Sequence, residues 1–356
     1  MKRRARKSTS RAFTLIELML VMGMMAILMA ATGLALAQAM EQGRASRTQA
    51  QIARIHSLLM TRYDSYRSRT IRLVNSTGIQ SANPNWTPAD QNMFNTQRRI
   101  DRLRGIRMTM RLEMPDCLRD LFDTDAGGNP IPVYDPVGSA TISNFTMPGN
   151  GINVVSTLKR PTLSDSYFRR VKTANTNFPG RFASTGDNAP SECLYLVLSS
   201  IQDGDTNGLD FLLPSEIGDT DQDGIPEILD SWGRPIFYFR WAPGMESPMQ
   251  NQRDPDPFDP MNVDPRSTVV DPVTGKRGTF AMTPLVYSAG PDGRYGFVYC
   301  PDAAFTYSAS QNPIAETNDP FCVPPMGAQY GYIAPSPDGT QGWHDNIMSH
   351  FLSNKN

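Results

Sequence analysis

Residues 11–37 read RAFTLIELMLVMGMMAILMAATGLALA, and the apolar part of this stretch decides how the chain is built. The twenty residues from Leu18 to Ala37 carry no charge, and a helix needs ~20 such residues to cross a bilayer. By the positive-inside rule, the basic tip in front of them stays in the cytoplasm and the rest of the chain is exported. The six basic residues of this tip, with no acidic residue among them, are Lys2, Arg3, Arg4, Arg6, Lys7 and Arg11.

A cleavable secretory signal is the alternative interpretation of this run. Signal cores usually have roughly 7–15 apolar residues, fewer than are found here, although ALAQ at residues 35–38 leaves a signal-peptidase cut open. Glu17 favours another explanation, because a carboxylate in hydrocarbon costs on the order of 2.5–3.5 kcal/mol. No basic residue follows within the span, so we expect the partner of Glu17 to be the amine of a new N-terminus or a group on another chain.

The stretch FTLIEL, Phe13 to Leu18, resembles the processing and methylation motif of type IV prepilins and type II secretion pseudopilins. The resemblance implies that a prepilin peptidase cuts between Ala12 and Phe13 and that the new N-terminus is methylated. Glu17 is then the fifth mature residue, which in this family neutralises the N-terminal amine of a neighbouring subunit in the filament. The family usually has Gly before the cut, where this chain has Ala12.

The resemblance also implies an α+β fold, in which a long N-terminal helix joins a globular head with an antiparallel sheet, enlarged by insertions. The expected segments are a basic leader (1–12), the transmembrane half of the helix (13–40), its amphipathic half (41–73), an insertion of mixed helix and loop (74–190) and a pseudopilin-like head (191–356).

The expected partners are a prepilin peptidase and methyltransferase, identical or related pilin subunits and an inner-membrane assembly platform. The expected location is the bacterial inner membrane, crossed once, with a cytoplasmic N-terminus and a head in the periplasm or at the cell surface.

Helical spacing continues beyond the apolar run. No Pro occurs between Phe13 and Leu73, and we predict one helix over that range with its second half packed on a sheet. We further predict a helix over residues 91–112 and a short one from Cys193 to Ile201, capped at Ser191–Glu192. The stripe that supports the first helix consists of Ile52, Ile55, Leu59, Tyr63 and Tyr66.

Composition argues against a nucleic-acid partner for the whole chain, which has 356 residues, a net charge of -1 and a pI of about 6.3. Residues 41–111 nevertheless carry thirteen Arg and no Lys, whereas residues 201–300 carry sixteen acidic residues. This asymmetry could draw copies of the chain together, or it could be ordinary bias on solvated surfaces. The basic segment RRIDRLRGIR is expected to be a solvated face or a subunit contact.

An acidic loop follows the short helix. Asp219, Asp221 and Asp223 alternate before Gly224, which matches the first half of a calcium loop, and Asp230 falls at its twelfth position. We therefore expect Ca²⁺ at these four aspartates. An acidic surface turn without metal is the alternative.

Three later stretches resemble the C-terminal part of the major pseudopilin: DSWGRPIFYFRWAPG (230–244), PLVYSAGPDGRYG (284–296) and HDNIMSH (344–350). The resemblance implies a second calcium site made by Asp292, the carbonyl of Ala289 and Asp345, with Asn346 in place of a second acid. A Pro-Asp-Gly turn without metal is the alternative. Strands are predicted over Ile236–Trp241, Leu285–Ser288 and Phe297–Cys300.

The cysteines and histidines form no recognisable catalytic or zinc motif. Cys300 and Cys322 are the first candidates for a disulfide in an exported head, with buried thiols as the alternative. His344 and His350 are expected to be polar surface residues. Since GxSxG, HExxH and phosphate-loop patterns are also missing from the sequence, we predict that the chain is not an enzyme.

The sequence thus predicts a structural subunit of a pseudopilus for type II-like protein secretion. Two alternatives stay open: a surface type IV pilus subunit for adhesion, motility or DNA uptake, and a membrane-anchored binding module exported by the prepilin route.

Overall fold

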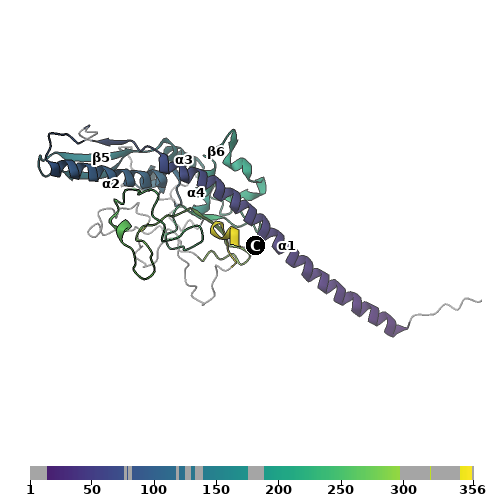
Figure 1. Ribbon diagram of the computed structural model, residues 1–356. Helices are drawn as coiled ribbons and strands as arrows, with labels where there is room; N and C mark the ends of the chain where they lie inside the picture. The colour runs from purple at the N-terminus through teal and green to yellow at the C-terminus, as the bar shows by residue number, and fades with distance from the viewer. Residues whose placement is uncertain are drawn as a thin grey trace, which may run out of the picture. The chain divides into compact units, whose positions relative to one another are not determined.

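The computed structural model describes residues 14–75, 78, 82–117, 120–124, 130–132, 139–174, 188–296, 321 and 345–354. The chain forms two compact units, residues 1–46 and 47–356. Helix α1, Leu15–Ser68, begins in the first unit and ends in the second, and Figure 1 draws it without interruption. It ends five residues before the predicted Leu73, because the β-branched Thr70 and Ile71 lead into strand β1, Leu73–Asn75.

The second half of α1 forms part of the core of the second unit. All five residues of the predicted stripe, Ile52 to Tyr66, are at most 1% exposed, which confirms the 3.6-residue periodicity. Their polar ends are also satisfied: the Tyr63 hydroxyl donates to the carbonyl of Met282 (3.0 Å) and the Tyr66 hydroxyl to Glu113 (2.8 Å). Helix α1 is therefore held to the head by apolar burial and by hydrogen bonds together.

Helix α2, Pro88–Glu113, confirms the second predicted helix and begins three residues earlier. Thr87 caps it by accepting from the backbone N–H of Asp90 (3.2 Å), and Pro88 suits the first helical position. The expectation of a solvated basic face is wrong for Arg107, which is 3% exposed and pairs with Asp256 (3.1 Å) and Asp264 (3.5 Å).

In the described part of the head, two three-stranded antiparallel sheets organise the fold, which confirms the α+β class. The first has the order β1-β5-β4, with β4 at Ser139–Thr146 and β5 at Asn153–Lys159. This sheet packs on α2 (Figure 1), where Ile142 of β4 and Leu158 of β5 form one apolar cluster with Met108 and Leu112.

The second sheet has the order β10-β11-β12. Strand β10, Phe237–Phe239, is shorter than predicted, and β11, Leu285–Ser288, has the predicted bounds. Strand β12, Ile347–Met348, pairs with β11, whereas the predicted strand Phe297–Cys300 lies outside the described residues. The core beside this second sheet contains Phe239 stacked on Tyr287, with ring centroids 5.5 Å apart.

Shorter elements complete the head. They are β2 (Phe122–Thr124), β3 (Pro130–Pro132), α3 (Thr162–Ala174), α4 (Ala189–Leu198), β6 (Gln202–Asp203), β7 (Thr206–Asn207), η2 (Gly208–Phe211), η3 (Pro214–Glu216), β8 (Ile217–Gly218), β9 (Glu227–Ile228), η4 (Pro265–Thr268) and η5 (Ser349–Asn354).

Helix α4 corrects the predicted cap. Ser191 lies inside the helix, and its hydroxyl donates to the carbonyl of Ile228 (3.2 Å) and accepts from its N–H (3.1 Å). Ser191 therefore joins α4 to β9. The helix also contacts β10 of the second sheet.

His350 corrects the prediction of a polar surface residue. It is fully buried; Nδ1 lies 3.0 Å from the Ser247 hydroxyl, and Nε2 lies 3.0 Å from the Thr283 hydroxyl and 3.1 Å from the Pro284 carbonyl. Burial, together with the nearby His56, lowers the pKa of His350 to about 4. The imidazole is therefore neutral at pH 7.

We predict that His350 contributes a loss of stability as the pH falls from about 6.5 to about 4, seen as the difference between wild type and His350→Gln. Across this window the unfolded chain takes up a proton on this histidine and the folded chain does not, so the contribution of His350 to the free energy of unfolding falls by roughly 1 kcal/mol per pH unit. Urea unfolding of the full chain in detergent at pH 7, 6 and 5 measures this slope. His350→Gln is expected to remove this contribution, and His56, whose pKa burial also lowers, contributes in the same direction. An unchanged slope in His350→Gln would contradict the prediction.

Candidate functional site

Strands β8 and β9 pair antiparallel, and the acidic loop, residues 219–226, connects them. The carboxylates of Asp219, Asp221 and Asp223 each bring an oxygen within 4.8 Å of the others, so the structure unites three of the predicted ligands. Asp219 accepts from the N–H groups of Asp223 (3.1 Å) and Gly224 (3.0 Å), which curls the loop inward. Gly224 has φ of +95°, and a Cβ there would lie 2.7 Å from the carbonyl of Ala174.

Asp230 is not part of this group. It is 4% exposed, and Oδ1 accepts from the N–H groups of Trp232 (2.8 Å) and Arg234 (3.0 Å), while Oδ2 accepts from the Ser288 hydroxyl (2.6 Å). Asp230 therefore fixes the turn that leads into β10 and ties it to β11, instead of closing the acidic loop as the twelfth-position pattern predicts.

Two glutamates that sequence reasoning missed lie beside the loop. Oxygens of Glu192, on α4, and Glu227, on β9, come within 4.8 Å of each other and of an Asp221 oxygen. Glu227 is the ninth residue counted from Asp219, a ligand position in calcium loops, so the spacing could have revealed it. Glu192 comes from a separate helix, and no local pattern points to it.

The second predicted calcium site is assembled in part. Asp345 Oδ2 accepts from the N–H of Asp292 (3.0 Å), which brings the two aspartates to one turn. The guanidinium of Arg234 donates to the carbonyls of Gly290 (2.5 Å) and Pro291 (3.0 Å), and a cation already occupies this side of the turn. Asn346 donates to the carbonyl of Tyr295 (2.7 Å). Neither aspartate belongs to a three-ligand group within the described residues.

At the other end of the chain, Thr14 and Glu17 form a capping box at the start of α1. The Thr14 N–H (2.9 Å) and hydroxyl (3.0 Å) donate to Glu17 Oε2, and the Glu17 N–H donates to the Thr14 hydroxyl oxygen (3.3 Å). Glu17 thus has a partner within its own chain, beyond the partners that the sequence suggested. Ala12 and Phe13 lie outside the described residues.

The first half of α1 is apolar and exposed. Its large apolar side chains from Leu15 to Met40 are 44–78% exposed, and its most apolar 18-residue window has a mean hydropathy of 2.2. By length and composition, this helix could cross a membrane.

Comparison with protein families finds the prokaryotic N-terminal methylation motif at residues 7–33, which include Phe13, Glu17 and the start of the apolar helix. Together with the long N-terminal apolar helix, this motif supports a type IV pilin-like protein. Comparisons with curated proteins and with solved structures found no match. The motif supports a role for this pilin-like protein as a prepilin-like subunit of a pilus or pseudopilus, anchored by its apolar helix. It also implies processing by prepilin peptidase, and it indicates a structural rather than a catalytic role.

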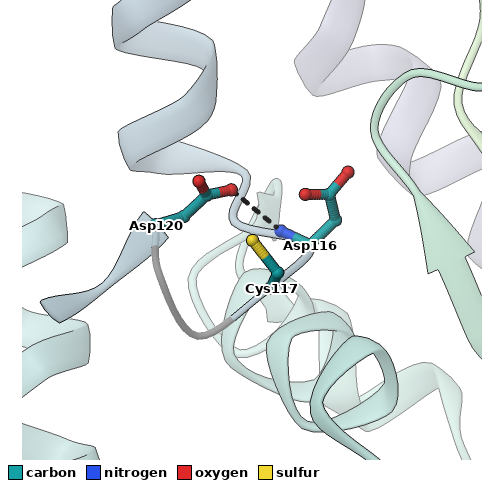
Figure 2. A group of neighbouring side chains, drawn as sticks. All are labelled: Asp116, Cys117 and Asp120. Atoms are coloured by element: carbon teal, nitrogen blue, oxygen red, sulfur yellow. Dashed lines mark hydrogen bonds between the residues drawn. The ribbon is translucent and has the colours of Figure 1, made fainter. Parts of the chain in front are cut away.

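A third acidic group in the pilin-like protein lies after α2, where Asp116, Cys117 and Asp120 approach one another (Figure 2). Asp120 Oδ2 accepts from the Asp116 N–H (3.4 Å). Arg240 pairs with Asp120 (2.7 Å) and Asp116 (3.3 Å), and Arg111 also pairs with Asp120. Against the opposing effect of burial, these two arginines lower the pKa of Asp120. The group is therefore a buried ion-pair network that needs no metal.

Of the cysteines in these predictions, the structure describes Cys193 but not Cys300 or Cys322. Cys193 is buried, with a free thiol whose pKa burial raises, which agrees with the alternative of buried thiols at this position. Cys300 and Cys322, the predicted disulfide, lie outside the described residues.

We predict that Arg240→Ala lowers the free energy of unfolding by about 3–5 kcal/mol, because it leaves the half-buried Asp116 without its cation and the buried Asp120 with Arg111 alone. Urea unfolding of the full chain in detergent measures the change. Arg67→Ala is the matched control, since Arg67 pairs with Asp64 on the surface, and we expect a change below about 1 kcal/mol. Equal losses in the two variants would show that the buried network is not a major source of stability.

Proposed function

We propose that the chain is a pseudopilin-like structural subunit, without enzymatic activity, that assembles into a filament for type II-like protein secretion. In this proposal prepilin peptidase cuts before Phe13 at the cytoplasmic face of the inner membrane, and the new amine is methylated. The head stands outside the cytoplasm. An inner-membrane platform then moves the subunit from the bilayer into the filament, next to identical or related subunits.

The exposed apolar half of α1 carries the proposal. Side chains such as Leu15 (78% exposed) and Leu34 (71% exposed) find no partner in the described part of their own chain, and water is an unfavourable solvent for them. A bilayer satisfies them before assembly, and the same helices of other subunits satisfy them afterwards. The transfer costs little hydrophobic free energy, because one apolar surrounding replaces another.

Apolar packing alone does not fix how neighbouring helices are aligned along their axes, and we assign that role to the charge of Glu17. The capping box holds its carboxylate in the first turn of α1, four residues after the proposed amine of Phe13. The Thr14 groups that donate to the Glu17 carboxylate are uncharged, so its negative charge remains in an apolar surrounding without a counter-ion. The positively charged amine of an adjacent subunit is therefore a favourable partner. This pairing would fix the axial register between neighbouring helices.

The C-terminal sheet favours secretion over a surface pilus. The stretches that resemble the major pseudopilin, around Trp232 and around Ser288, contact each other through Asp230 and form β10 and β11. The resemblance therefore involves a packed unit and not separate turns.

Two variants separate charge from capping. Glu17→Gln keeps a side chain that can complete the capping box but removes the charge, and we expect about tenfold less subunit in sheared filaments, with membrane insertion unchanged. Thr14→Ala removes the cap and keeps the charge, and we expect assembly within about twofold of wild type. The amounts in membrane and filament fractions are measured by immunoblot. Full assembly by Glu17→Gln would refute the charge-pairing role.

N-terminal sequencing of protein from cells with and without prepilin peptidase tests the processing step. We expect methylated Phe13 as the first residue in the first case and the uncut leader in the second. A mature chain that begins beyond residue 37 would instead support a secretory signal. Long filaments on the cell surface, with normal secretion after deletion of the gene, would support the surface-pilus alternative.

A further inference from the structure

Five carboxylates converge between α4 and the β8–β9 hairpin, and we call them the acidic cluster. Its members are Glu192, Asp219, Asp221, Asp223 and Glu227. The cluster has a buried floor, where Glu192 is 2% and Glu227 0% exposed, and an exposed mouth formed by Asp219 and Asp221. The two overlapping groups share Asp221, so one ion could reach both floor and mouth.

No positive side chain of the described part of the chain neutralises the floor. Among the described residues, neither Glu192 nor Glu227 forms an ion pair with Lys or Arg. Glu227 accepts from neutral donors: the Thr220 N–H (2.8 Å), the Thr220 hydroxyl (3.1 Å) and the Asn188 amide (3.0 Å). The Asp116–Asp120 network differs in this respect, because Arg240 reaches both of its carboxylates.

The buried carboxylate of Glu192 points to a bound ligand. Its Oε2 is buried and has no hydrogen-bond partner among the described residues, although the atom lies in a polar cluster. Burial, followed by the charges of Asp223, Asp221, Glu227 and Asp219, raises the pKa of Glu192 to about 9. A buried polar atom without a partner is unfavourable, and so is a set of like charges without a counter-ion.

We propose that the acidic cluster binds one Ca²⁺ and that Glu192 of α4 supplies the ligand that the twelfth loop position supplies in an EF-hand. Asp219, Asp221 and Asp223 occupy the first, third and fifth positions, and Glu227 occupies the ninth. Asp230, at the twelfth, is bound to Ser288 and to backbone N–H groups. An all-oxygen set of this size suits a hard cation that takes six to eight ligands, which favours Ca²⁺ over the smaller Mg²⁺.

The ion would connect elements that are far apart in the sequence. Ser191 already joins α4 to β9 through both backbone groups of Ile228, directly beside Glu192 and Glu227. A Ca²⁺ ion bound by both glutamates would fasten the acidic loop to this joint, and α4 in turn contacts β10. Calcium would therefore order the hairpin and α4 as a unit.

Calorimetry with CaCl2 on the chelator-treated full chain in detergent tests the site. We expect one Ca²⁺ per wild-type chain and a rise in Tm with added calcium. Asp221→Asn and Glu192→Gln are each expected to weaken binding at least tenfold. Asp205→Asn is the matched control, because Asp205 is an exposed acid of the same segment outside the cluster, and we expect affinity within about twofold of wild type.

Glu192→Gln also distinguishes a loss of calcium binding from a loss of the fold. The substitution keeps the shape of the side chain and removes a buried acid, so its Tm without calcium should equal or exceed that of wild type while the calcium-induced rise disappears.

Three results would overturn the proposal: no heat and no rise in Tm up to about 10 mM CaCl2, well above the range of weak extracellular sites; wild-type affinity in Glu192→Gln; or equal weakening in Asp205→Asn. Equal affinity for MgCl2 would overturn the assignment to calcium. Because the isolated chain is measured, none of these outcomes depends on filament assembly.

Discussion

One helix has to satisfy two surroundings, and the rest of the molecule depends on that constraint. The first half of α1 is apolar on every side and is compatible with lipid or with other apolar helices. The second half is apolar on one stripe, from Ile52 to Tyr66, and is compatible with a protein core. Two compact units follow from this change of pattern, although the helix itself continues.

Charge is handled inside the head in two ways. Arg107, Arg240 and the arginines around Glu113 are each matched to buried or half-buried carboxylates. Such pairs contribute less to stability than apolar packing would, but they penalise any arrangement that separates the partners. The acidic cluster follows the opposite rule, since carboxylates are collected there and, within the described ranges, no arginine or lysine pairs with Glu192 or Glu227. This contrast between two kinds of buried acid is the reason to assign a ligand to one and not to the other.

Periodic features of the fold could be predicted from the sequence. The stripe on α1, helix α2 and strand β11 all follow from local spacing and were found with nearly correct bounds. Tertiary partners could not be predicted. Arg107 looked like one of many surface arginines because Asp256 and Asp264 lie 149 and 157 residues away. His350 looked polar and exposed because nothing in HDNIMSH shows that Ser247, Thr283 and Pro284 enclose its ring.

The candidate site divides in the same way. The mouth of the acidic cluster is one contiguous motif, and even Glu227 fits its spacing. Glu192 is found only once α4 is placed beside β9. Asp230 is the opposite case. It occupies a ligand position in the sequence pattern, but its carboxylate accepts a hydrogen bond from Ser288 in the neighbouring sheet.

The continuity of α1 has a mechanical consequence. A pull on its apolar end travels along an uninterrupted backbone to the stretch between Thr48 and Tyr66, which is bonded sideways to Ser231, Leu229, Met282 and Glu113. Tension along the axis loads these lateral bonds in parallel, as shear, instead of peeling them apart one after another. A force applied to the N-terminal half of α1 can therefore move the head without first detaching the helix from it.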